Sequence, residues 1–257
     1  MQEPGWTTQD NLPRTKTPGD GGSGFDSSRS RNQDWSTRFS WERLLDQLLG
    51  HRSGLTIVDV GARYGESSRF FDSILPVKAI YAFEPDPRTY PYLRADAPAH
   101  WRTYNCALSS ESGTDTFWLS SLPGMSSLTR INPDSKDSLD FASNESMEPV
   151  TVDVKRLDDV VPGDVCIDLM KIDAQSAEKM VLQGASETLQ RTSVVVVEVS
   201  LYDMYETQTR LGDIESLLRD FRLYAVPFVS QNPGNLRTDW LECVYVRDSR
   251  NSTAHGK

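Results

Sequence analysis

The sequence predicts one α/β domain built on a mostly parallel sheet that helices cover on both faces. From residue 55 onward, short β-branched runs alternate with helical patterns, as in a parallel sheet. A turn poor in side chains, "GARYG" at 61–65, directly follows the first strand. The last two strand-like runs are joined by "SQNPGNL" at 230–236, which has no helical pattern. These two runs are therefore expected to pair as an antiparallel hairpin at the sheet edge.

The two ends of the chain differ in composition from its middle. Hydrophobic residues make up 37% of the 257 residues, less than the roughly 45–50% that is typical when Gly is counted. Residues 1–37 are rich in Gly, Ser, Thr, Pro, Asp and Asn, so we expect a disordered tail there. The folded domain is expected over 38–248, followed by a short tail at 249–257.

Order is expected to begin with a helix in "SWERLLDQLLG", residues 40–50. Ser40 is suited to cap its first turn and Gly50 to end it. Its apolar stripe consists of Trp41, Leu44, Leu45 and Leu48.

Seven strands and four further helices follow. The final two strands form the expected hairpin, and the others belong to strand–helix units. In chain order the expected elements are strand 55–59, helix 65–74, strand 79–83, a helix started by Pro87, strand 102–107, strand 167–172, helix 177–182, strand 194–199, helix 211–221, strand 223–228 and strand 241–246.

An insertion near 107–156 interrupts this alternation. The strand-like stretches "GTDTFWLS" and "PVTVDVKRL" flank a polar loop of about thirty residues, longer than ordinary connectors. Because its ends are strands, we expect the insertion to act as a lid.

Composition argues against several classes of protein. A formal net charge of -10 disfavours nucleic-acid binding. The longest strongly apolar run, 194–197, is far too short to span a membrane. Cys106, Cys166 and Cys243 lie far apart in stretches that read as strands, so we expect buried free thiols and a reducing, cytoplasmic location.

The glycine turn and two acids predict the ligand. Gly61 and Gly65 frame a turn at the carboxyl end of the first strand, where open α/β sheets bind ligands. Their G-x-x-x-G spacing differs from the G-x-G-x-x-G that holds a dinucleotide pyrophosphate. Asp59 ends the first strand and Glu84 the second, where Glu84 can accept both hydroxyls of a ribose. A ribose that carries a positive charge suits two acids, and S-adenosylmethionine has both.

At the level of motifs, the chain resembles the FkbM-type methyltransferases from about residue 55 to 246. The stretches that carry the resemblance are "VDVGARYGE", "FEPDP", "NCALSSESG", the "SSL" at 126–128, "LDDV", "MKIDAQSAEKMVLQGA" and "VVEVS". The resemblance implies a class I methyltransferase (Rossmann-like) fold with a seven-strand sheet. It also implies S-adenosyl-L-methionine as cofactor and O-methylation of a small-molecule hydroxylated acceptor, such as a sugar, polyketide or glycolipid.

Carried onto this chain, the motifs imply a set of cofactor contacts. Two positions depart from the family pattern: Gln175-Ser176 stands where relatives usually have Glu-Gly, and Arg63 stands where they often have Asn. Loss of the glycine is expected to re-aim the loop after Asp173. The implied cofactor-binding residues are Asp59, Gly61, Arg63, Gly65, Glu66, Glu84, Ala107, Leu108, Lys171 and Asp173.

An acceptor hydroxyl must lose a proton during methylation, and carboxylates are the candidates to take it. His51 and His100 precede strands, at the amino edge of the sheet, and His255 lies in the C-terminal tail. Asp173 and Glu198 end strands at the opposite edge, so we predict both as catalytic residues, Asp173 as base or hydroxyl acceptor. For Glu198, a structural role beside a backbone amide or Lys171 is equally consistent. No cluster has metal-ligand spacing, so no metal is expected.

The predicted acceptor contacts lie in the lid and after the fifth strand. They are Ser127, Tyr202 and Tyr205. Aromatic side chains at such positions serve packing as often as recognition.

Two rival functions remain open. One is a cofactor-binding partner protein of methyltransferase fold with little or no activity, a reading motivated by Gln175-Ser176. The other is a nicotinamide oxidoreductase, against which the missing third glycine and the terminal hairpin count. The sequence does not indicate an oligomeric state.

Overall fold

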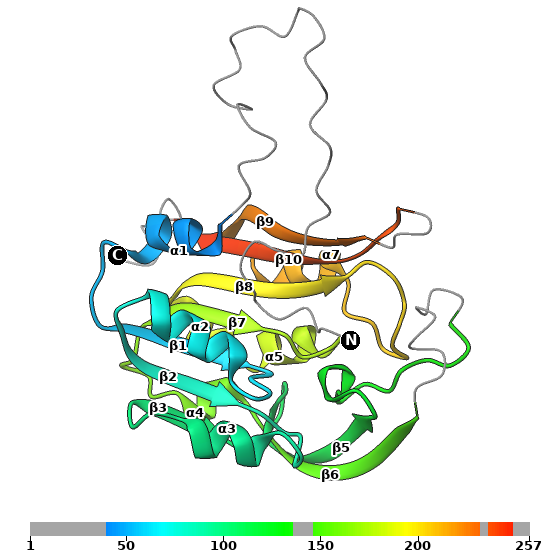
Figure 1. Ribbon diagram of the computed structural model, residues 1–257. Coiled ribbons are helices and arrows are strands. Elements are labelled where there is room, and N and C mark those ends of the chain that lie inside the picture. The colour runs from blue at the N-terminus through cyan, green and yellow to red at the C-terminus, as the bar shows by residue number, and fades with distance from the viewer. Residues whose placement is uncertain (1–39, 136–145, 232–235, 249–257) are drawn as a thin grey trace, which may run out of the picture.

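The computed structural model describes residues 40–135, 146–231 and 236–248 (Figure 1). The tails predicted at 1–37 and 249–257, with His255, lie outside the described residues, as does part of the predicted lid. The main sheet has seven strands. In spatial order they are β3 (Trp101–Tyr104), β2 (Val77–Phe83), β1 (Leu55–Val60), β7 (Ile167–Ile172), β8 (Thr192–Ser200), β10 (Thr238–Arg247) and β9 (Phe221–Gln231).

Strand directions confirm the predicted fold class. The five strands from β3 to β8 pair in parallel, and β10 runs antiparallel between β8 and β9. The chain moves outward from β1 to β3 and then returns to β7 on the other side of β1. The carboxyl ends of β1 and β7 therefore form the point where strand order reverses, which is where sheets of this kind bind ligands.

The parallel strands are buried because both faces of the sheet are covered. All six residues of β1 are buried. Val58 and Val60 pack in one core cluster, whereas Leu55 and Ile57 pack in another. This follows from the alternation of side chains along a strand.

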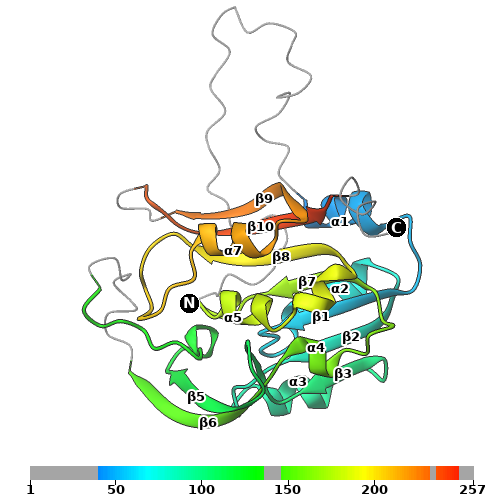
Figure 2. The same cartoon turned by 180° about the vertical axis from the view of Figure 1, so that it is seen from behind.

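Two layers of helices supply the other half of each cluster. Figures 1 and 2 show the layers from opposite sides. One layer contains α1 (Trp41–Leu49), α2 (Glu66–Ile74) and α3 (Tyr90–Asp96), and the other contains α4 (Leu157–Val160), α5 (Glu178–Gln183), α6 (Ser186–Gln190) and α7 (Leu211–Leu217). Ser40 caps α1 as predicted, since its hydroxyl accepts from the amide of Arg43.

Several predicted boundaries were wrong, three of them as follows. Pro87 does not start a helix: the chain makes a turn in which Thr89 N donates to Asp86 O, and α3 begins at Tyr90. The helix predicted at 211–221 ends at Leu217, because β9 starts at Phe221. The strand predicted at 102–107 ends at Tyr104.

The insertion forms a second sheet. Its strands are β4 (Ala107–Leu108), β6 (Met147–Lys155) and β5 (Gly113–Ser120), in that spatial order. β5 and β6 pair antiparallel over their whole length, so the two strand-like stretches lie where the sequence predicts them. In both views they extend past the carboxyl ends of the parallel strands, on the β3 side (Figures 1 and 2).

The cysteine prediction was partly wrong. Cys243 is buried in β10. Cys106 is also buried but lies in the bend between β3 and β4, and Cys166 is exposed just before β7. Among the described residues the longest helices have nine residues, and none is long and apolar enough to cross a membrane.

Candidate cofactor and active site

The turn after β1 brings two backbones into contact. Gly61 has φ 74°, and a Cβ there would stand 1.9 Å from the carbonyl oxygen of Asp173. The amides of Gly61 and Ala62 both donate to Phe83 O, at 3.1 and 3.0 Å. Gly65, with φ 88°, stands immediately before α2. A residue with a side chain at Gly61 would separate these loops, so the glycine is required for the close approach.

Glu84 lies beside this turn and is 5% exposed. Its Oε2 accepts from Arg63 N at 2.7 Å, and its Oε1 accepts from Asp86 N at 2.8 Å. Burial raises the pKa of Glu84 to about 7, against the effect of these two amides. The sequence placed Glu84 next to the glycine turn, and the structure brings them together. The contact with a ribose stays a prediction.

Arg63 and Glu66 both support the backbone of the glycine turn, Arg63 through its amide and Glu66 through its carboxylate. Arg63 has φ 53°, a left-handed conformation that is uncommon for a residue with a side chain. Its amide is the one that reaches Glu84. Glu66 begins α2, and its Oε2 accepts from Tyr64 N at 3.1 Å. Both residues therefore help to shape the predicted cofactor turn.

Asp59 and Lys171 form a buried charge pair under the turn. Asp59 is fully buried, and Ser68 Oγ donates to its Oδ2 at 2.6 Å. Lys171 Nζ lies 3.8 Å from Asp59 Oδ1 and 3.3 Å from Asp173 Oδ2. Within the described part of the chain, Asp59 Oδ1 has no hydrogen-bond partner. Burial raises the pKa of Asp59. Burial opposes the charge of Lys171, but Asp173 and Asp59 outweigh it and raise the pKa of the lysine.

Two further acids, which the sequence analysis missed, extend this cluster. Glu242 of β10 pairs directly with Glu198 of β8. Burial raises the pKa of Glu242 to about 8 and that of Glu178 to about 7. Glu242 interrupts an apolar strand, "WLECVYV", and this irregularity was a usable signal. With Asp59, acids outnumber Lys171 in this cluster, and a cation nearby would favour their ionised forms, so the cluster suits a cationic ligand.

The two predicted catalytic acids, Asp173 and Glu198, have different surroundings in the structure. The side chain of Asp173 is 29% exposed, at the carboxyl end of β7. Burial, followed by Asp173 and Glu242, raises the pKa of Glu198 well above its usual value. The Glu198 carboxyl group also accepts a hydrogen bond from Gln175 Nε2 at 3.0 Å, so it is held by its neighbours. Of its two predicted roles, the geometry favours the structural one.

Gln175 and Ser176 form the loop after Asp173, and the re-aiming of this loop relative to relatives stays a prediction. Both residues have positive φ, 51° and 79°. Ser176 Oγ donates to Thr207 O at 2.8 Å and accepts from Thr209 N at 2.9 Å. The hydroxyl thus ties this loop to the segment after β8, and these bonds offset the cost of a left-handed conformation.

The predicted acceptor residues lie differently from expectation. Ser127 and Tyr205 are each 1% exposed. Ser127 Oγ donates to Ala174 O at 3.1 Å, and the Tyr205 hydroxyl lies 3.2 Å from Met125 O. They hold the insertion against the loop after β7, so the structure does not present them to an acceptor. Tyr202 is half-buried, and the guanidinium of Arg237 stacks 3.9 Å from its ring centre.

Ala107 and Leu108, expected beside adenine, are buried in β4 and pair with β6. They belong to the small sheet rather than to the edge strand of the main one. Their contact with the adenine of the cofactor stays a prediction. The two histidines among the described residues lie away from the acid cluster: His100, just before β3, bonds Asp72 at 2.9 Å, and His51 is exposed just before β1.

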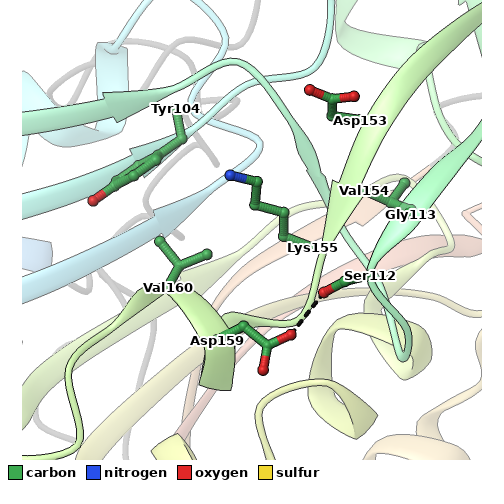
Figure 3. A pocket seen from close by; sticks show the side chains of 8 residues that line it. All are labelled: Tyr104, Ser112, Gly113, Asp153, Val154, Lys155, Asp159 and Val160. Atoms are coloured by element: carbon green, nitrogen blue, oxygen red, sulfur yellow. Dashed lines mark hydrogen bonds between the residues drawn. The ribbon is translucent and has the colours of Figure 1, made fainter.

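A separate open groove of about 590 Å³ lies between the end of β3, the end of β6 and α4 (Figure 3). Across it, Ser112 Oγ donates to Asp159 Oδ2 at 2.7 Å. The groove is lined by Tyr104, Ser112, Gly113, Asp153, Val154, Lys155, Asp159 and Val160. None of these is a predicted site residue. We place the candidate site at the acid cluster instead, because the glycine turn, the strand reversal and the excess negative charge coincide there.

The described residues fit S-adenosylmethionine. The cluster of acids suits a nucleoside that bears a cation, and one of these acids, Asp59, has a buried oxygen without a hydrogen-bond partner among the described residues. Gly61 has no side chain and leaves the backbone of the turn open to a ligand. The described part of the chain has no group of three or more His, Cys, Asp or Glu side chains that could hold a metal ion.

Comparison with known proteins agrees with this reading. Residues 59–223 match the sequence profile of the methyltransferase FkbM domain. The chain belongs to the FkbM methyltransferase family. Membership implies a methyltransferase that uses S-adenosylmethionine.

Curated relatives extend over most of the same region. The 2-O-methyltransferase NoeI of Sinorhizobium fredii is 30% identical over 177 residues, covering 66% of this chain and 73% of the relative. The 31-O-demethyl-FK506 methyltransferase FkbM of Streptomyces tacrolimicus is 29% identical, covering 65% and 72%. Methyltransferase sdnD of Sordaria araneosa is 33% identical, covering 64% and 71%.

A solved structure, methyltransferase FkbM from Methylobacillus flagellatus KT, is 16% identical with a TM-score of 0.45. The alignment covers 75% of this chain and 43% of that one. At this score the likeness adds nothing to what the strand order establishes.

Proposed function

We propose that this FkbM-family protein transfers a methyl group from S-adenosylmethionine to a hydroxyl oxygen of a small molecule. The observation that carries the proposal is the position of Asp173. The Asp173 carboxylate is partly exposed and lies 3.3 Å from the Lys171 ammonium. The backbone carbonyl of Asp173 lies against Gly61 in the glycine turn. A base for the acceptor and a cofactor turn thus share one edge of the sheet.

When bound, the cofactor supplies a methyl group on a sulfonium, which is already activated for displacement. Glu84 and the turn at Gly61 are proposed to hold the nucleoside, and Asp59 and the other acids to favour its positive charge. Asp173 would accept the proton of the acceptor hydroxyl while the oxygen of that hydroxyl bonds to the methyl carbon. The proton held by Asp173 would then leave to solvent, with S-adenosylhomocysteine as the other product.

The names of two relatives support oxygen as the acceptor atom, because both specify O-methylation. A sugar, polyketide or glycolipid alcohol is the proposed acceptor class. The net charge of -10 argues against a nucleic acid in that role.

The test measures tritiated methyl transfer from S-adenosylmethionine to a panel of monosaccharides, oligosaccharides and polyketide alcohols. We expect turnover on at least one alcohol, and a loss of about 100-fold or more in Asp173→Asn, the scale of a lost general base. The matched control, Asp164→Asn, changes an exposed acid at the amino edge and should leave turnover unchanged. Calorimetry with S-adenosylhomocysteine should show measurable binding in all three proteins. Retained binding without any turnover would support the inactive partner protein instead.

A further inference from the structure

The side chain of Gln175 joins the two acids at the candidate site. Its Nε2 donates to Asp173 Oδ1 at 2.8 Å and to Glu198 Oε1 at 3.0 Å. Both hydrogens of the amide are therefore used on carboxyl groups. Its Oε1 lies 2.9 Å from the hydroxyl of Tyr205. One neutral side chain thus connects β7, β8 and the segment after β8.

These partners also determine which way the amide points. A flipped amide would set its oxygen against oxygens of both acids, and its NH2 group against Tyr205. In the observed orientation, the Tyr205 hydroxyl has one proton to share between Gln175 Oε1 and Met125 O. Met125 belongs to the insertion. The network therefore extends from the lid to the predicted base.

The backbone around Gln175 is held in a conformation that side chains disfavour, with φ 51°. The next residue, Ser176, is left-handed too, and Glu178 Oε1 accepts from the amides of Ala174 and Ser176 at 3.0 and 3.1 Å. The fold thus maintains a strained turn that aims the Gln175 amide between two acids. Such strain persists only where surrounding contacts enforce it.

We propose that Gln175 is a positioning residue, whose amide holds the carboxylates of Asp173 and Glu198 together and aims Asp173 at the acceptor hydroxyl. The proposal rests on the methyl-transfer function proposed above. Gln175 fixes Asp173 Oδ1 while Lys171 fixes Oδ2, so the carboxylate cannot rotate freely. The amide donates to both acids at once, whereas a carboxylate at this position would set its oxygens against theirs.

The first test needs no ligand and compares the melting temperature from pH 5 to pH 8. Gln175→Glu adds an acid between two acids, which raises carboxyl pKa values in the folded state above those of the unfolded chain. Stability is then retained at low pH and lost as pH rises. We expect this variant to lose roughly 3–5 °C more than the wild type over that range, the effect of about one unit of pKa shift in a chain of this size.

Two controls accompany it. Gln175→Leu removes the donor at similar volume without adding an acid, so its melting temperature should fall less steeply with pH than that of Gln175→Glu. Gln47→Glu makes the same amide-to-acid change at an exposed position of α1, where Gln47 donates to Tyr224, and should show no such extra loss.

The second test measures turnover on whichever alcohol of the panel the wild type methylates. Both Gln175 variants should lose roughly 10- to 100-fold in kcat, the cost of a misaligned catalytic group. Affinity for S-adenosylhomocysteine should stay within about 3-fold of wild type. The reason is that the Gln175 side chain contacts Asp173, Glu198 and Tyr205 and not the glycine turn. Gln175→Glu should also move the acid limb of the pH–rate profile upward.

The outcomes separate the two proposals. Full turnover in Gln175→Leu, or a melting profile of Gln175→Glu that parallels the wild type, would overturn the positioning role. A wild type that neither binds S-adenosylhomocysteine nor methylates any alcohol would overturn the proposed function. In that case the melting profile still decides whether the amide bridges the acids.

Discussion

The two sides of the candidate site are held together differently. On the β1–β2 side, backbone groups dominate: Glu84 is fixed by two amides, and Gly61 touches the carbonyl of Asp173. On the β7–β8–β10 side, side chains dominate, with Lys171 and Gln175 placed among the acids. We therefore expect the first side to depend mainly on backbone shape and the second mainly on side-chain charge and hydrogen bonding. Predictions that separate these two kinds of support follow, from the largest expected effect to the smallest.

Removing the only lysine of the cluster should be the most damaging change on the side-chain side. Lys171→Met leaves Asp59 and Asp173 without their cation, and breaking a buried pair costs about 3–5 kcal/mol of unfolding free energy. Urea denaturation measures the loss. It should be smaller at pH 5 than at pH 8, because protonated acids no longer need a cation. Lys179→Met, which removes an exposed pair with Asp213, is the control and should cost less than about 1 kcal/mol.

Adding one methyl group should disrupt the backbone side. Gly61→Ala forces a Cβ against Asp173 O from a positive φ, so we expect a loss of about 3 kcal/mol in unfolding free energy. Gly212→Ala provides the contrast. Gly212 lies in α7 with open space around its Cβ position, and the helix propensity of alanine should stabilise it by about 0.5–1 kcal/mol. Equal effects from the two substitutions would contradict the close approach at Gly61.

The smallest effect concerns cofactor affinity at Glu84. Calorimetry with S-adenosylhomocysteine should show a loss of about 1.5–3 kcal/mol in Glu84→Ala, the scale of hydrogen bonds to a charged group. The pKa of Glu84 is raised to about 7, so its carboxylate forms as pH rises from 6 to 8. Wild-type affinity should increase over that range, and Glu84→Gln should remove the dependence. Glu187→Gln, at an exposed position of α6, serves as the control, and unchanged affinity in Glu84→Ala would exclude the ribose contact.

Much of the backbone side was predictable from local patterns. A buried strand followed by a glycine turn and a helix places Gly61 and Glu84 at neighbouring strand ends, because parallel strands of one sheet share a carboxyl edge. The start of α3 was not predictable in the same way. Thr89 and Asp86 form a turn whose hydrogen bonds outcompete the preference of Pro87 for a first helical turn.

The side-chain side was predictable only in part. Asp173 and Glu198 could be placed at strand ends, but the raised pKa of Glu198 depends on burial and on acids from other segments. Ser127 and Tyr205 were assigned to the acceptor because exposure cannot be read from residue type. Both are buried, and their hydroxyls brace the insertion.

By itself, the sequence determined the order of strands and helices, the glycine turn and the acid at the end of each neighbouring strand. These depend on periodicity and on residues close together along the chain. Only the tertiary structure decided that Glu242 meets Glu198, that Gln175 lies between two acids and that Tyr205 turns inward. Those contacts join segments far apart in sequence, and the charge of a buried acid depends on every group around it.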